Sequence, residues 1–264
     1  MAAPTDFFRR CFAYALVLAC TPGMCLQLSG QAAVPASQRV PVLVELFTSE
    51  GCSSCPPADK LLQQLDAEQP IPGADAIVLS EHVTYWNHDG WRDPFSLDAM
   101  TERQEDYQRR FGLDSSYTPQ MVVDGTSQFV GSNAKALITA VTNEAKTPKL
   151  PLLIEGARWD HGSVVFTVQA DASSRAKLYA VLAEDATHSQ VTRGENAGRT
   201  LHHTAVVRAM KEYSGKDAAG GLLRLQGGAL VTAGEAGGAV RLIVFLVDPG
   251  TGHVVGAAEQ TLQR

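Results

Sequence analysis

Two cysteines, Cys52 and Cys55, are separated by two serines and followed by two prolines. A thiol pair at this spacing can close a disulfide, exchange it with another thiol, or bind a soft metal ion. In thiol–disulfide exchange the attacking species is the thiolate, so the chemistry depends on what stabilises that anion. The spacing alone does not decide among these three chemistries. The predicted strands and helix around the pair have to be considered as well.

The segments on either side of the pair predict a strand, a helix and a second strand. Residues 41–48 are an apolar run rich in β-branched side chains, and residues 76–83 are another, so both favour buried strands. Apolar residues recur at helical spacing over 58–67. This βαβ order places the cysteines where the helix begins, close to unpaired N–H groups and the positive end of the helix dipole. Cys52 is therefore the expected nucleophile and Cys55 the resolving thiol.

Three features around the pair change how strongly the first thiol is activated. Pro56 and Pro57 suit the first helical turn but remove two N–H donors. The negative charge of Glu50 opposes a thiolate, whereas the hydroxyls of Ser53 and Ser54 can donate to one.

The N-terminal segment has the order of a secretory signal. Arg9 and Arg10 precede the apolar stretch 11–20, and small residues follow up to Ala33 and Ala36. We predict a signal peptide over residues 1–33 and a periplasmic or secreted protein, while a retained membrane anchor and a lipid on Cys20 stay open as alternatives. Three of the five cysteines, at positions 11, 20 and 25, fall in this region. Only Cys52 and Cys55 then remain, in an oxidising compartment that favours their pairing.

The bulk composition is that of an ordinary globular protein. The chain has 264 residues, 19% charged side chains and a formal net charge of −6. Its lysines and arginines are not clustered, so we do not expect a nucleic-acid-binding surface. After Pro148 the pattern changes to short strands separated by Gly-Gly turns, which predicts a small β-sandwich.

One segment resembles the signature of a known family. Residues 44–59, Val-Glu-Leu-Phe-Thr-Ser-Glu-Gly-Cys-Ser-Ser-Cys-Pro-Pro-Ala-Asp, are similar to the start of a secreted bacterial family known as domain of unknown function 1223. The resemblance continues through residues 82–86, 90–95, 101–104, 117–125 and 194–202. It implies a thioredoxin-like fold and supplies no function. Thioredoxin-like domains place a cis proline beside the redox cysteines, and Pro119, at the start of a predicted strand, matches that position.

The predicted fold class is therefore an α/β thioredoxin-like domain followed by an all-β sandwich-like domain. The predicted boundaries are 34–148 for the first domain, which includes an aromatic insertion, and 149–264 for the second. In the insertion, Tyr85, Trp86, Trp91 and Phe95 are interpreted as a local core in preference to a substrate platform. In the second half, the polar cluster Glu195, Asn196, Arg199, His202 and His203 is interpreted as a turn entering an edge strand.

These patterns favour an exported thiol–disulfide oxidoreductase that uses Cys52, Cys55 and Pro119, although whether the chain is an enzyme stays open. The expected partners are protein or small-molecule thiols and disulfides, without a cofactor, nucleic acid or, after signal cleavage, a membrane. Two alternatives remain. One is a periplasmic zinc- or copper-binding protein in which His82 and His88 join the two thiols. The other is a binding module with an inert disulfide. The oligomeric state, the redox partner and the direction of electron flow are not determined by the sequence.

Overall fold

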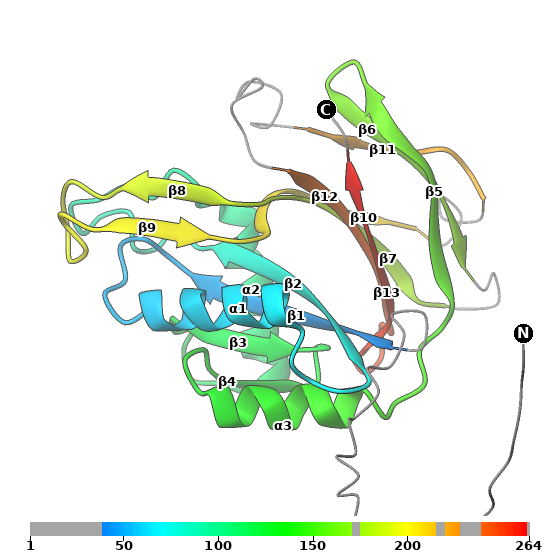
Figure 1. The fold of residues 1–264 in the computed structure, drawn as a ribbon, viewed down its shortest axis with the longest axis horizontal. Coiled ribbons are helices and arrows are strands. Elements are labelled where there is room, and N and C mark those ends of the chain that lie inside the picture. The colour runs from blue at the N-terminus through cyan, green and yellow to red at the C-terminus, as the bar shows by residue number, and fades with distance from the viewer. Residues whose placement is uncertain (1–38, 171–174, 215–219, 228–238, 263–264) are drawn as a thin grey trace, which may run out of the picture. The chain divides into compact units, whose positions relative to one another are not determined.

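A computed structural model describes residues 39–170, 175–214, 220–227 and 239–262, with thirteen strands and three helices among them (Figure 1). The predicted signal peptide, with Cys11, Cys20 and Cys25, lies outside the described residues.

The predicted βαβ unit is present at the start of the described chain. It consists of β1 (Val40–Thr48), α1 (Pro56–Glu68) and β2 (Ala74–His82). The two strands are parallel, with Val40 opposite Ala74 and Thr48 opposite His82. Both strands are buried along most of their length, as expected for parallel strands that are covered on both faces. Their carboxyl ends therefore meet at the same edge as the loop that carries the cysteines.

The next elements cover this unit and extend it. They are α2 (Asp98–Phe111), β3 (Gln120–Val123), β4 (Ser127–Val130) and α3 (Ala134–Glu144). Strand β3 pairs with β1 in the antiparallel direction, and β4 pairs back on β3. Helices α1 and α2 contact opposite faces of β1, because Thr48 donates to Asp59 of α1 whereas Glu45 accepts from Tyr107 of α2. Helix α3 begins directly after Asn133, whose side chain accepts from the N–H of Ala136.

The second half of the chain supplies strands almost throughout. They are β5 (Leu152–Asp160), β6 (Ser163–Ala170), β7 (Lys177–Glu184), β8 (Thr187–Gln190), β9 (Thr200–His203), β10 (Val206–Tyr213), β11 (Leu223–Gln226), β12 (Val240–Val247) and β13 (Val254–Leu262). Strands β11, β6 and β5 form a three-stranded sheet, and β8 and β9 form a separate hairpin. The other four strands join the sheet begun by β1.

The prediction of an α/β thioredoxin-like domain followed by an all-β sandwich-like domain is wrong. One mixed sheet of eight strands runs in the order β13-β12-β7-β10-β2-β1-β3-β4, so it combines strands from both halves of the chain. The junction is a single parallel pairing of Val206 in β10 with Ser80 in β2. An uncovered strand edge is a row of free N–H and C=O groups that can pair with many sequences. The local pattern of each strand therefore gives no sign that β10 covers the edge of β2.

Two apolar layers hold this arrangement together. One lies around β1 and β2, where Leu46 and Leu79 are fully buried. The other lies between the three-stranded sheet and the β7–β12 part of the large sheet, where Phe166 packs near Leu182 and Val244. Burying a side chain of this size contributes about 1.5–3 kcal/mol. Within the described residues, no helix is both long and apolar enough to cross a membrane.

Candidate functional site

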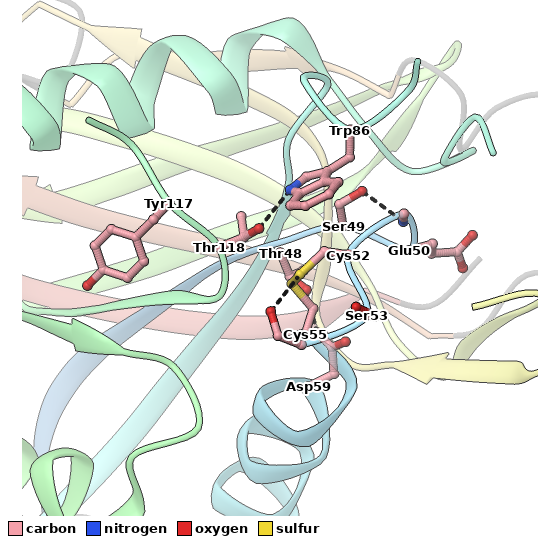
Figure 2. Close-up of a disulfide and its surroundings, with 12 residues drawn as sticks. Thr48, Ser49, Glu50, Cys52, Ser53, Cys55, Asp59, Trp86, Tyr117 and Thr118 are labelled. Carbon is pink, nitrogen blue, oxygen red and sulfur yellow. Dashed lines mark hydrogen bonds between the residues drawn. A yellow bond between two sulfur atoms is a disulfide. The ribbon is translucent and has the colours of Figure 1, made fainter. Parts of the chain in front are cut away.

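Cys52 and Cys55 form a disulfide at the start of α1 (Figure 2). Their sulfurs are 2.15 Å apart and their Cα atoms 5.5 Å apart. Helix α1 begins directly after Cys55, with the two prolines in its first turn. Both cysteines are 0% exposed, whereas Ser53 and Ser54 between them are exposed. The Sγ of Cys52 lies 3.3 Å from the hydroxyl oxygen of Ser54, which is the contact expected of a donor to a thiolate.

An aromatic side chain and the loop before β3 lie near the disulfide. Figure 2 shows Trp86 and Thr118 beside the two sulfurs. The indole Nε1 of Trp86 donates to the hydroxyl of Thr118 at 2.7 Å, and the Thr118–Pro119 peptide bond is cis. A Cβ built on Gly51 would lie 3.0 Å from the Cβ of Trp86, so a larger residue at position 51 would press on Trp86. The aromatic loop therefore contributes to the site, although the sequence pattern favoured a separate core for it.

A buried carboxyl group lies one helical turn below Cys55. Asp59 follows Cys55 by four residues on α1 and is 5% exposed. Its Oδ1 accepts from the hydroxyl of Thr48 at 2.9 Å, and its Oδ2 is 3.9 Å from Nδ1 of His203. Burial raises the pKa of Asp59 above its usual value, and the nearby imidazole of His203 partly opposes that shift. A proton-holding group therefore lies on the same helical face as the resolving thiol.

Two histidines meet beneath this loop. The Nδ1 of His82 lies 2.7 Å from Oδ2 of Asp93, and both side chains are fully buried. Burial by itself lowers the pKa of His82, but the charge and hydrogen bond of Asp93, together with the charges of Asp59 and Glu50, outweigh burial, and the net pKa is raised. Burial alone would raise the pKa of Asp93, but the charge of His82 lowers it to about 2. The ring of His203 lies edge-on to that of His82, with centroids 4.6 Å apart. Among the residues that the structure describes, Nε2 of His82 and Nδ1 of His203 are buried and have no hydrogen-bond partner.

The β8–β9 hairpin holds the cysteine loop from the other side. The amide of Asn196, at the tip of the hairpin, donates to the carbonyl of Glu50 at 2.8 Å and to that of Cys52 at 3.0 Å. Glu195 accepts from the N–H of Ser53 at 3.1 Å. These bonds fix the backbone on both sides of the first cysteine, although the hairpin comes from more than 140 residues further along the chain.

The carboxylate of Glu50 is bound away from the sulfurs. It accepts from Nε1 of Trp91 at 2.8 Å and from the hydroxyl of Ser189, and it lies 3.2 Å from Nε2 of His203. Figure 2 shows the side chain of Glu50 pointing away from the disulfide. The sequence predicted that this charge opposes a thiolate, and these partners reduce that opposition because they neutralise or solvate the carboxylate.

Sequence reasoning missed Asp59, Asp93, Asn196 and His203 as members of one site. The polar cluster at 195–203 gave a signal, but its interpretation as a turn carried no information about what the turn contacts. The second signal was that residues 194–202 belong to the segments that resemble the family, which turn chemistry alone does not explain.

The structure does not gather the four residues of the predicted metal site. The cysteines are joined to each other, His82 is engaged with Asp93, and the side chain of His88 is 76% exposed beside Asp89. In the described part of the chain, the group of three or more potential ligands that lie close together is elsewhere, at Asp124, Glu144 and His253. There the Nζ of Lys149 already bonds Asp124 at 2.7 Å and the carbonyl of Val254 at 2.9 Å, so an ammonium group takes the place of an ion.

Comparison with known proteins assigns the chain to a family. The model of a family described as "Protein of unknown function (DUF1223)" matches residues 43–244. The chain belongs to this family. DUF1223 thus covers the cysteine loop, the aromatic loop and the hairpin together, and the family resemblance read from the sequence is confirmed.

The fold of this DUF1223 protein has a counterpart among solved structures. The crystal structure of protein AGR_C_4864 from Agrobacterium tumefaciens is similar, with a TM-score of 0.59 and 25% sequence identity. The match covers 85% of this chain and 95% of the other. No curated protein matches. The comparisons therefore supply a family and a fold, and the chemistry has to be argued from the site.

Proposed function

We propose that this protein exchanges disulfides with partner thiols through Cys52 and Cys55. The observation that carries the proposal is the position of their disulfide at the N-terminus of α1, with the buried acid Asp59 one turn below Cys55. The helix dipole stabilises a thiolate at such a position. A purely structural bridge between residues three apart in sequence would stabilise the fold only weakly, by roughly 2 kcal/mol.

The reaction needs no group beyond the partner's own sulfur. In the oxidising direction, a partner thiolate attacks Sγ of Cys52, the Cys52–Cys55 bond breaks, and its electron pair goes to Sγ of Cys55. Asp59, whose pKa burial raises, gives its proton to the Cys55 thiolate. A second partner thiolate then attacks the partner sulfur and releases Cys52 as a thiolate. The partner loses two electrons and the protein gains them, and the reverse sequence reduces a partner disulfide.

The partner class follows from the closed state of the site. Both cysteines are fully buried, so the proposed exchange requires the loop around the disulfide to open before a partner reaches Cys52. The exposed backbone at Ser53 and the loop at Thr118–Pro119 then flank the sulfur. We propose protein or small-molecule thiols and disulfides as partners, in the periplasm or outside the cell, as the signal-like order of residues 1–33 supports.

The test is exchange measured on the mature protein and on single-cysteine variants. Cys52→Ser should abolish reaction with glutathione disulfide, whereas Cys55→Ser should accumulate a mixed disulfide at Cys52 that mass spectrometry detects. Gln64→Ala, at an exposed position on α1, serves as a control and should keep most of the rate. The wild-type pair should titrate with a midpoint at roughly −120 to −270 mV. A pair that stays oxidised below about −300 mV, with no mixed disulfide in Cys55→Ser, would identify an inert bridge.

A further inference from the structure

The β8–β9 hairpin has two chemically different faces. Residues alternate along its strands, so the buried His203 faces the cysteine loop while its neighbour His202 faces solvent. On β8 the same alternation directs Ser189 to Glu50 and leaves His188 exposed. The inner face thus belongs to the disulfide site, and the outer face carries two histidines that the proposed exchange does not use.

The two outer histidines are direct partners across the hairpin. His188 lies opposite His202 in the register of β8 and β9. Their rings are stacked, with centroids 5.8 Å apart and planes inclined by 29°. Directly opposed residues have Cβ atoms about 4.5–5.5 Å apart, which brings two imidazoles within reach of one ion. In the described part of the chain, neither ring is held by a hydrogen bond, so both can turn their nitrogens toward a shared ligand.

We propose that His188 and His202 form a surface site for a divalent transition-metal ion, with Cu²⁺ preferred. Neutral imidazole is a good ligand for copper, nickel and zinc, and water can complete the coordination of an exposed ion. A pair that is free to rotate imposes little geometry, so its affinities should follow the intrinsic order in which Cu²⁺ exceeds Ni²⁺ and Zn²⁺. This site is independent of the thiols and of the proposed exchange reaction.

The other five of the seven histidines do not offer such a pair. His82 and His203 are buried in the disulfide site. His253 is held between Glu144 and Lys149. His88 and His161 are exposed, but each is paired with the neighbouring aspartate in sequence. Two accessible imidazoles on facing strands therefore occur together at His188 and His202.

A bound ion would also stabilise the hairpin that grips the cysteine loop. It would tie β8 to β9 at the outer face, and the inner face of the same two strands carries the contacts of Ser189 and His203 with Glu50. Because the ion binds the folded hairpin and not an unpaired strand, the thermal stability of the protein should rise with copper concentration.

The test is calorimetric titration of the tag-free, disulfide-intact protein with CuCl₂ at about pH 7.5. The mature protein, without residues 1–33, lacks Cys11, Cys20 and Cys25, and its intact disulfide removes Cys52 and Cys55 as ligands. We expect one equivalent of copper at this site, at least tenfold weaker binding in His188→Gln and in His202→Gln, and its loss in the double variant. His161→Gln, another exposed histidine on a strand hairpin, is the matched control and should bind as the wild type does.

A second readout separates binding from folding. The melting temperature of the wild type should rise with copper, and that of the double variant should not, while both proteins melt alike without copper because the two side chains lie outside the core. The proposal is overturned if the double variant binds copper as tightly as the wild type, or if the wild type takes up none. Either result leaves the exchange activity of Cys52 and Cys55 untouched, so the two proposals fail separately.

Discussion

The second half of the chain contacts the first half at both ends of β1, but the polar groups in the two contacts differ. At the carboxyl end, the β8–β9 hairpin meets the disulfide loop, and imidazole nitrogens of His82 and His203 are buried without partners. At the amino end, the ammonium of Lys149 fills the space between Asp124, which also accepts from the N–H of Leu43, and the carbonyl of Val254. The carboxyl end thus keeps imidazole nitrogens that make no hydrogen bond, whereas at the amino end the buried ammonium of Lys149 is paired with the carboxyl group of Asp124.

This difference suggests different roles for the two ends of β1. The Lys149 end stabilises the contact between the two halves of the chain, and the disulfide end carries the reactive group. A buried polar atom without a partner costs about 1–3 kcal/mol, so a protein that tolerates two of them beside a disulfide keeps them for a reason other than stability. The Lys149 end has the opposite character, because its buried cation and anion satisfy each other. Substitutions at the two ends should therefore differ in their main effect: a large loss of stability at the Lys149 end, and a loss of exchange with smaller changes in stability at the disulfide end.

The largest effect is expected from Lys149→Met at the amino end of β1. This change leaves Asp124 as a buried carboxyl without its cation, and breaking such a pair typically costs about 3–5 kcal/mol. Burial already raises the pKa of Asp124 to about 7 with Lys149 present, so the variant should suffer more above that pH, where the carboxyl is ionised. Urea unfolding at two pH values measures the loss.

The exposed Lys146 offers a matched control for this measurement. Lys146→Met removes the same charge three residues away, at an exposed position, and should change the unfolding free energy by at most about 0.5 kcal/mol. The midpoint potential of the disulfide should be the same in both variants. A changed midpoint potential in Lys149→Met, with stability retained, would contradict the distinction between a stabilising Lys149 end and a reactive disulfide end.

The next effect is expected at the reactive end, in Asp59→Asn. The amide keeps the size of the side chain but cannot exchange a proton with Cys55, so the exchange rate should fall roughly tenfold to hundredfold. Its stability should change little, since the uncharged side chain suits the burial that already raises the pKa of Asp59. A loss of the pH dependence of the rate, measured with a small disulfide, would mark a role in proton transfer. A variant with wild-type rate and pH profile would place the proton acceptor elsewhere.

The smallest effect is expected from the His82–Asp93 pair as the pH is raised. His82 has a raised folded-state pKa, so its contribution is complete below the unfolded value of 6.5 and is lost as pH rises through the folded value. Asp93, with its pKa lowered to about 2, contributes above its unfolded value of 3.8 and loses its effect only as pH falls toward 2. Between pH 6 and pH 9 the pair should therefore lose stability, and the loss comes from His82.

Asp93→Asn isolates that contribution from other titrating groups. Asp124 also binds a proton more tightly in the folded state and gives a loss of the same sign, but it does so in both proteins and cancels from the difference. The variant should be less stable than the wild type at pH 6, and the gap should narrow by pH 9. A gap that stays constant would mean that His82 is neutral throughout.

Several features of this protein could be predicted from the sequence because they depend on neighbours in the chain. The apolar runs flanking Cys52 and Cys55 predicted β1, α1 and β2, and the spacing of the cysteines brings their sulfurs within bonding distance at the start of a helix. The strands of the second half were also largely anticipated, since alternation and Gly-rich turns are local signals. The family, too, was evident in the motif around Cys52.

What the sequence left open depends on contacts between distant segments. A strand's pattern shows which of its faces is buried but not which strand pairs with its edge, so the joining of β10 to β2 became clear only in the tertiary structure. The same holds for the site. Asn196 and His203 gain a role because the hairpin folds back over a loop that lies more than 140 residues earlier, and nothing within their own segment records that contact. The chain thus determined the thiol pair locally, and the three-dimensional packing decided what surrounds it, because burial and hydrogen bonding depend on proximity in space.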